Sequence, residues 1–170
     1  TAVGKDALAA NTTASSNTAI GADSQKLTTT GTNNTSVGQN SMDANTTGTA
    51  NTALGSGALG GNTTAGNNTA VGKDSLKANT TGASNVAVGA YALDANTTAD
   101  YNNAFGYEAL SANTSGTLND AFGYVALAAN TTGSHNTAIG GGALDSNTTG
   151  DSNCSVGRDA LGVNTTASNN

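Results

Sequence analysis

The chain offers little for acid–base or nucleophilic chemistry, because it contains one histidine, His135, and one cysteine, Cys154. A catalytic nucleophile needs an adjacent base, which a third group orients. His135 lies beside Asn136 in a polar stretch, where we expect an exposed surface residue. Cys154 has no second cysteine with which to form a disulfide, and we expect a buried or unreactive thiol. The sequence therefore predicts that the chain is not an enzyme.

Metal and phosphate sites are not indicated either. Asp43, Asp94 and Asp145 occupy one position of a repeated motif but never in adjacent copies, so we expect them not to share a metal ion. The glycines at 140–142 are expected to form a flexible turn, since no strand–helix frame surrounds them as in a phosphate-binding loop. We expect no cofactor.

A polar motif, N-T-T or N-T-S, matches the acceptor pattern for N-glycosylation. The possible glycan acceptors are Asn11, Asn45, Asn62, Asn79, Asn96, Asn113, Asn130, Asn147 and Asn164. Asparagine also bonds nearby backbone at corners, and identical asparagines stacked above one another bond each other as a ladder. We therefore expect a corner and ladder role, and at most partial glycosylation.

All aromatic residues lie between residues 91 and 124. Tyr107 and Tyr124 are one repeat apart and exposed in our reading, so they could stack on a sugar or a partner protein. The alternative is that the rings only stack on each other. The candidate ligand patch consists of Tyr91, Tyr107, Tyr124, Val125, Tyr101 and His135. Phe105 and Phe122, also one repeat apart, are expected to enlarge the core.

These residues are placed by a strict repeat, because the chain divides into ten units of 17 with the pattern T-A-[VILF]-G-x-x-[AS]-L-x-[AS]-N-T-T-[GA]-x-x-N. Such a period indicates a solenoid, in which each unit is one coil that packs only on its neighbours. We expect one all-β domain over 1–170, a parallel β-solenoid about 48 Å long if coils stack about 4.8 Å apart. Its coils cover 1–17, 18–34, 35–51, 52–68, 69–85, 86–102, 103–119, 120–136, 137–153 and 154–170.

Position 4 of every coil is glycine, which indicates a positive φ or a backbone approach too close for a Cβ atom. These structural glycines are Gly4, Gly21, Gly38, Gly55, Gly72, Gly89, Gly106, Gly123, Gly140 and Gly157. Position 17 is always asparagine, as expected at a corner.

Positions 2 and 3 are both apolar, and neighbours in a strand point to opposite faces. One face is expected to fill the coil interior, and the other then needs a partner, so we expect an obligate oligomer. We expect a strand over positions 1–4, a turn at 4–6 and a second extended segment at 7–10, with a helical turn as the alternative at 7–10. In the second coil, Gln25 replaces the usual leucine. There we expect Leu27 to take the core place through a register shift, and the packing to be poorest.

The net charge of −6 and a pI near 4.2 disfavour nucleic acid and anionic membranes as partners. No run of about 18 apolar residues could span a bilayer, and we see no signal peptide. Neither end has the atypical capping repeat that a solitary solenoid needs. We therefore expect a segment of a longer fibre or a subunit that stacks end to end.

The segments 17–21 and 136–140, both N-T-A-I-G, and 143–150, A-L-D-S-N-T-T-G, carry a resemblance that extends over the whole chain. The sequence resembles tandem-repeat phage and viral tail fibres, and it is similar to the heads of trimeric autotransporter adhesins. The resemblance implies a left-handed parallel β-roll, a homotrimer, and an extracellular stalk or receptor-binding head on a virion, a cell surface or a secreted filament. The adhesin-head repeat is shorter than 17 residues, which leaves the handedness open.

The first reading is therefore a structural and adhesive extracellular fibre segment, whose partners are its own copies and a host-surface glycan or protein. A self-assembling extracellular filament is one alternative. An ice-binding solenoid is another, because threonines at positions 12 and 13 could present hydroxyls to ice. Against it, these threonines are adjacent, and only one of two neighbours in a strand faces outward.

Overall fold

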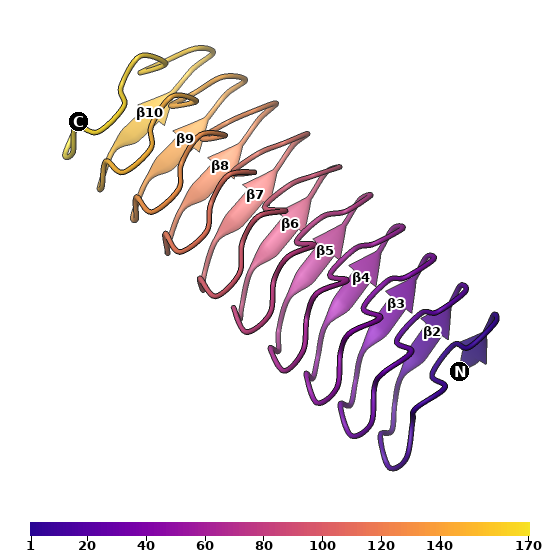
Figure 1. Cartoon of the computed structure of the whole chain (residues 1–170). Coiled ribbons are helices and arrows are strands. Elements are labelled where there is room, and N and C mark those ends of the chain that lie inside the picture. The colour runs from indigo at the N-terminus through magenta and orange to yellow at the C-terminus, as the bar shows by residue number, and fades with distance from the viewer.

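The computed structural model describes residues 1–170 as a rod of ten stacked coils, each with one short strand (Figure 1). The strands are β1 (Ala2–Val3), β2 (Thr18–Ile20), β3 (Thr35–Val37), β4 (Thr52–Leu54), β5 (Thr69–Val71), β6 (Val86–Val88), β7 (Asn103–Phe105), β8 (Asp120–Phe122), β9 (Thr137–Ile139) and β10 (Cys154–Val156). They form one parallel sheet in chain order. The expected all-β parallel solenoid with 17-residue coils is confirmed. The chain contains no helix, and therefore none with the length and apolar character of a membrane span.

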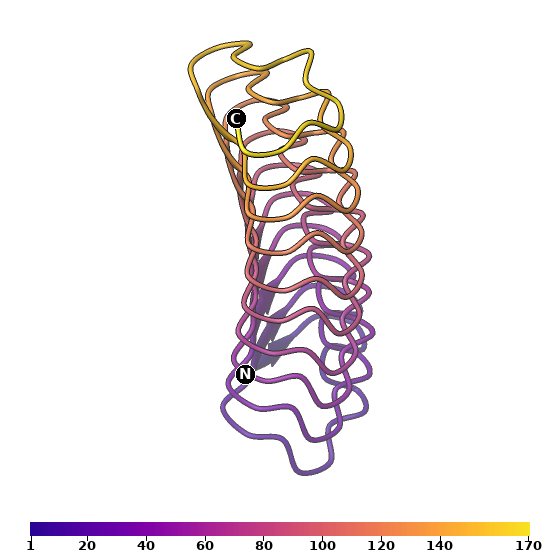
Figure 2. The ribbon, with the colours of Figure 1, turned by 90° about the vertical axis from the view of Figure 1, so that its left-hand side faces the viewer.

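The coils stack in strict register, so each position of the repeat forms a continuous column along the rod (Figure 2). Ala87, for example, lies between Ala70 and Ala104 of the neighbouring coils. Of 114 backbone–backbone hydrogen bonds, only 17 lie within strands, and the other 97 belong to turns and loops. Leu76 N donates to Ala92 O at 3.0 Å, well outside the sheet. The whole coil, and not only its strand, is therefore bonded to its neighbours.

Positions 4 to 10 form a turn without a second strand or a helix, so both of our expectations for positions 7–10 are wrong. The cause is two left-handed residues separated by one residue, since φ is +53° at Asp74 of position 6 and +51° at Leu76 of position 8. A left-handed conformation costs about 1–2 kcal/mol for a residue with a Cβ atom. Full burial of a leucine side chain contributes about 1.5–3 kcal/mol. Burial of position 8 therefore holds the turn in a conformation that leucine otherwise avoids.

The core is one column of large side chains at position 8, enclosed by alanine and serine at positions 2 and 7. The fully buried members of this column are Gln25, Met42, Leu59, Leu76, Leu93, Leu110, Leu127 and Leu144. Position 2, at the strand centre, is buried beside them, and position 3 faces outward. Phe105 and Phe122 consequently do not enlarge the core, and this expectation is wrong. Their rings stack outside the sheet with centroids 4.7 Å apart, and Phe122 is 39% exposed.

Coil 2 shows that the register does not shift. Gln25 occupies the core place of leucine, and Leu27 is half exposed, so the expected exchange between them is wrong. Gln25 Nε2 donates to Thr18 O at 2.9 Å and to Ser36 Oγ at 3.0 Å. Its Oε1 is the one buried side-chain polar atom in the molecule without a partner. Coil 2 therefore differs from the other coils by a buried unpaired oxygen and not by a shift in register.

Substitution of a position 4 glycine tests how closely the backbones of neighbouring coils approach each other. In a Gly89→Ala variant the new Cβ would lie 2.2 Å from Gly106 O, at a backbone φ of +138°. We expect a loss of at least about 3 kcal/mol in the free energy of unfolding, because overlap and strain add. Gly141→Ala is the matched control, since its Cβ would meet only Tyr124 O, at 3.8 Å. Equal thermal stability of the two variants, measured by circular dichroism, would contradict this account.

Gln25→Leu is expected to raise the free energy of unfolding by about 1–3 kcal/mol, because it removes a buried unpaired oxygen. The Ser36 hydroxyl keeps Ser24 as a partner. Gln39→Leu, at an exposed position of the next coil, makes the same replacement on the surface and should change stability by less than about 0.5 kcal/mol. Denaturant titrations check both variants, and a less stable Gln25→Leu protein would refute the assignment.

Candidate functional site

Two columns of asparagine form the polar part of the core. At position 17, Asn68 Oδ1 accepts from Asn85 N at 2.9 Å, and Asn68 Nδ2 donates to Gly82 O at 2.9 Å. At position 11, Asn79 Nδ2 donates to Asn62 Oδ1 at 3.1 Å and to Gly82 O at 2.9 Å. The expected asparagine ladder is confirmed, and it has two columns.

The possible glycan acceptors make up the position 11 column. Those of coils 3 to 9 are fully buried: Asn45, Asn62, Asn79, Asn96, Asn113, Asn130 and Asn147. Asn11 and Asn164, in the terminal coils, are more open. Because each buried Nδ2 donates within the core, as that of Asn79 does, the folded coils 3 to 9 do not present these amides at the surface.

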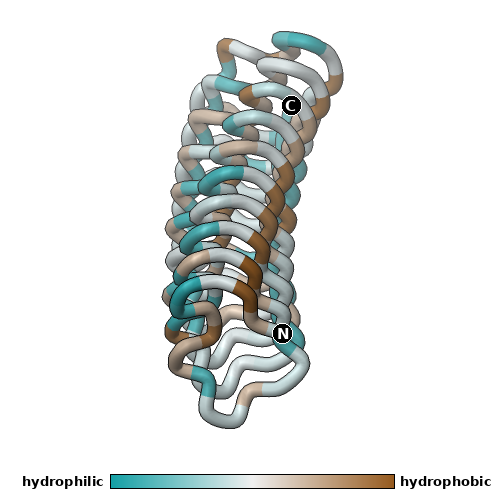
Figure 3. The backbone as a smooth tube through the Cα atoms, turned by 90° about the vertical axis from the view of Figure 1, so that its right-hand side faces the viewer, coloured by the Kyte–Doolittle hydropathy of each residue, from teal (hydrophilic) through white to brown (hydrophobic).

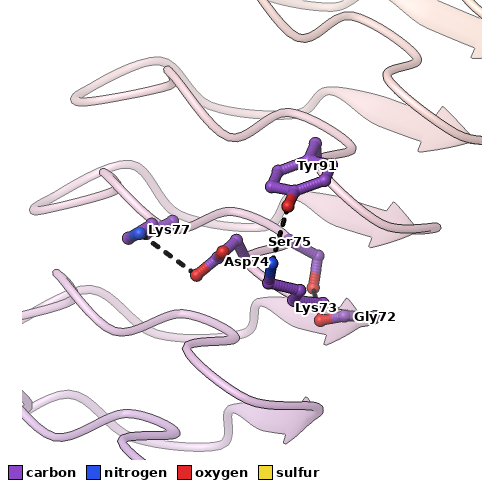
Figure 4. Close-up of polar contacts among 6 residues, drawn as sticks. All are labelled: Gly72, Lys73, Asp74, Ser75, Lys77 and Tyr91. Carbon is purple, nitrogen blue, oxygen red and sulfur yellow. Dashed lines mark hydrogen bonds and ion pairs between the residues drawn. The ribbon is translucent and has the colours of Figure 1, made fainter.

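The structure brings together three residues of the candidate ligand patch, Tyr91, Tyr107 and Tyr124. Tyr107 and Tyr124 stack with centroids 5.7 Å apart and planes at 11°, and Tyr91 meets Tyr107 edge to face at 6.0 Å. Tyr107 is 44% and Tyr124 64% exposed. Lys73 Nζ donates to the Tyr91 hydroxyl at 2.8 Å, which raises the pKa of Lys73, and lies 5.2 Å from the ring centroid (Figure 4). The rings thus contact each other and a cation.

The other patch residues lie elsewhere or contribute less. Tyr101 and His135 occupy position 16, which precedes the strand, whereas the stacked tyrosines follow it. Both are exposed, and Tyr101 belongs to none of the three ring pairs in the molecule. Val125 is half-buried next to Tyr124. The patch therefore divides between the two ends of the strand.

An acidic groove, which we define as the surface between the position 6 column and the columns at positions 9 and 10, runs along the rod. Three hollows of about 460, 480 and 450 Å³ lie in it, at coils 6 and 7, coils 3 to 5, and coils 9 and 10. The first is lined by Tyr91, Tyr107 and Glu108 on one side and by Asp94 and Ser111 on the other. The groove is formed by the left-handed turn. No residue pattern in the sequence predicted this turn.

The charged residues that flank the acidic groove account for the whole net negative charge of the chain. Positions 6 and 9 carry eight carboxylates and two lysines, which gives −6, and the formal net charge of the chain is also −6. The carboxylates are those of Asp6, Asp23, Asp43, Asp74, Asp94, Glu108, Asp145 and Asp159. The charges at positions 1, 5 and 15 cancel, with three of each sign.

The two groove lysines show how the groove holds a cation. Lys26 Nζ lies 2.9 Å from Asp23 Oδ1, and Lys77 Nζ lies 3.2 Å from Asp74 Oδ1 (Figure 4). In both pairs the aspartate is at position 6 and the lysine at position 9 of the same coil. The hydrogen bond from Lys26 lowers the pKa of Asp23 and raises that of Lys26.

Asp43 and Asp94 occupy position 9 without a lysine at position 6 or 9 of their own coils. Burial raises the pKa of both carboxyl groups. The folded chain therefore takes up these protons more readily than the unfolded chain, and the two ionised groups lower stability at neutral pH.

The outer sheet face, formed by side chains at positions 1 and 3, is the second candidate surface. Figure 3 shows hydrophobic residues aligned from coil to coil along the rod. Val3 is 57% and Leu54 48% exposed on this face. Asp120 is its only charged residue. Cys154 is exposed here, so of the two expected alternatives, a buried or an unreactive thiol, the buried one is wrong.

No group of three or more histidine, cysteine, aspartate or glutamate side chains is placed to hold a metal ion. Comparison of the chain with models of protein families, with curated proteins and with solved structures finds no match.

Asp94→Asn is expected to raise the melting temperature at pH 7, because it removes an ionised group whose burial disfavours the charge. The gain should vanish near about pH 3, where the wild-type carboxyl is protonated in both the folded and the unfolded state. Asp100→Asn is the control, since Asp100 Oδ1 accepts from Ala83 N at 2.6 Å and its replacement should bring no gain. A lower melting temperature for Asp94→Asn at pH 7 would contradict the sign.

Proposed function

We propose that the chain is a rigid segment of an extracellular fibre, which associates with its own copies through the outer sheet face and displays side chains to a host-surface glycan or protein. The observation that carries this proposal is the apolar position 3 column, which faces outward over the length of the rod. The resemblance of the repeat to tail fibres and adhesin heads supports the extracellular and adhesive parts.

The outer sheet face is suited to an interface between copies. Sheets of parallel strands occur almost only with both faces covered, and in a single chain this face is bare. A standard interface buries about 800 Å² per partner, and exposed apolar side chains such as Val3, Leu54 and Val156 recur on this face from the first coil to the last. Because the coils are in register, a second or third copy meets an apolar side chain at position 3 of every coil.

Charge does not oppose contact at the outer sheet face itself. A chain with a net charge of −6 repels its copies at long range. On the outer sheet face, however, only Asp120 is charged, and its Oδ1 accepts a hydrogen bond from Asn103 Nδ2 at 2.7 Å. The other carboxylates lie at positions 6, 9 and 15, outside the strands.

An ice-binding surface is the second candidate, because the outer sheet face also carries a threonine column. Thr1, Thr18, Thr35, Thr52 and Thr69 stand at position 1 of successive coils, on the same face as position 3. The column then changes to Val86, Asn103 and Asp120, so the hydroxyl array ends after five coils. The apolar column runs through all ten coils, which favours self-association.

The oligomeric state tests the proposal. We expect the wild-type chain to be a closed oligomer by light scattering, and Leu54→Asp to weaken association by about 30-fold or more, because it places a charge in the apolar column. Thr64→Asp, an exposed site of the same coil outside the sheet, is the control and should leave the oligomer intact.

A monomeric wild-type chain would refute self-association, and a thermal hysteresis assay would then test the ice-binding candidate. Open-ended polymers would instead support the self-assembling filament. Circular dichroism confirms in each case that the variant is folded.

A further inference from the structure

We infer that the acidic groove is a docking site for an extended basic segment of a partner protein, whose lysine or arginine side chains enter the hollows between coils. This inference goes beyond the proposed self-association, because the groove lies outside the outer sheet face and can be tested on associated and dissociated chains alike.

The chain's own lysines supply the first argument. In coils 2 and 5 an aspartate at position 6 holds the ammonium group of a lysine at position 9, as the pair Asp74–Lys77 shows (Figure 4). Coil 7 has Glu108 at position 6 but Ser111 at position 9. The place that a lysine side chain fills in coils 2 and 5 is there part of a hollow of about 460 Å³. A cationic side chain from a partner fits where the chain's own is missing.

The carboxylates that line this hollow lack an ion-pair partner. The three ion pairs of the molecule involve Asp23, Asp74 and Asp159, and neither Asp94 nor Glu108 belongs to one. Both carboxylates line the same hollow with no lysine or arginine among its residues. An arriving ammonium or guanidinium group would therefore meet two carboxylates that form no ion pair of their own.

The wall of the hollow also suits a cation. Tyr91 and Tyr107 line it, and aromatic rings attract cations within about 6 Å of the ring centroid. A cation already lies at this wall, since Lys73 Nζ donates to the Tyr91 hydroxyl at 2.8 Å, 5.2 Å from the ring centroid. A neutral sugar is favoured less, because Tyr107 stacks on Tyr124 with one face and contacts Tyr91 as well.

The spacing of the carboxylates selects a linear partner. Asp43 and Glu108, neither of which belongs to an ion pair, are four coils apart, which is about 19 Å along the rod. An extended polypeptide rises about 3.3–3.6 Å per residue, so about six residues cover this length. Several basic side chains on one such segment would engage successive hollows together, and the linkage raises the affinity above that of a single contact.

Calorimetric titration with octalysine, in about 20 mM and about 150 mM salt, tests the inference. We expect binding at low salt that weakens at least about tenfold at the higher salt, because exposed charges are screened. The double variant Asp94→Asn, Glu108→Gln should bind about tenfold more weakly than the wild type. Tyr107→Ser should weaken binding by about two- to fivefold, as loss of a cation–π contact predicts.

The control is the double variant Asp100→Asn, Asp151→Asn, which changes the net charge equally at position 15. It should bind octalysine within about threefold of the wild type. Equal losses in the two double variants would overturn the inference, because they would show attraction by net charge alone. Absence of octalysine binding at low salt would also overturn it.

Two further measurements separate the outcomes. Spermine carries the same ammonium chemistry without a polypeptide, so spermine binding as tight as that of octalysine would replace the partner segment by a free polyamine. The Leu54→Asp chain should bind octalysine like the wild type, so failure of self-association leaves the groove testable. Loss of binding in Leu54→Asp would place the site at the association interface and overturn its assignment to the groove.

Discussion

Two columns of buried asparagine hold the rod in register, and its surfaces depend on them. The position 17 amides of coils 1 to 9, such as that of Asn68, bond the same residue one coil on and a carbonyl at position 14. A slip of one residue would orphan the donor and the acceptor in every coil, at about 1–3 kcal/mol for each buried group. Because this cost recurs coil after coil, the register is far more sharply determined than a three-residue strand could make it alone. Gln25 illustrates this, since it stays in the core although Leu27 is nearby.

Because the register is strict, the residues at each position of the repeat all lie on the same surface or in the same part of the core. Side chains alternate across the strand, so position 2 lines the interior and positions 1 and 3 form the outer sheet face. In the turn, position 8 points inward, while positions 6 and 9 flank the acidic groove. One substitution changes the side chain of a column in one coil only. A substitution that recurs in neighbouring coils, such as tyrosine in coils 6 to 8, changes the surface over several coils.

The sequence predicts the period, the parallel stacking, the roles of glycine and asparagine and the exposure of Tyr107 and Tyr124, because each depends only on which residue type recurs. It does not reveal the turn, because leucine normally avoids the left-handed conformation that Leu76 adopts. Its burial in the core outweighs that preference, and only the assembled coil shows it. The same limit explains Phe105 and Phe122. Positions 2 and 3 are both apolar, and one leucine per coil leaves space for alanine alone beside it, so the larger side chains face outward. The groove was missed because it follows from the turn.

Most of the charged residues and the apolar position 3 column lie on different surfaces, so the outer sheet face can associate while the acidic groove stays open to a partner. If the carboxylates stood at positions 1 or 3, copies of an acidic chain would repel each other where they have to meet. With the carboxylates at positions 6 and 9, the outer sheet face stays almost uncharged. Association through that face would then hold several acidic grooves at constant spacing on one rigid body. A partner with several basic segments would meet the second groove at a high effective concentration once it had bound the first. The strength of such binding would rise with the number of associated chains and with the length of the rod, without any new contact within a coil.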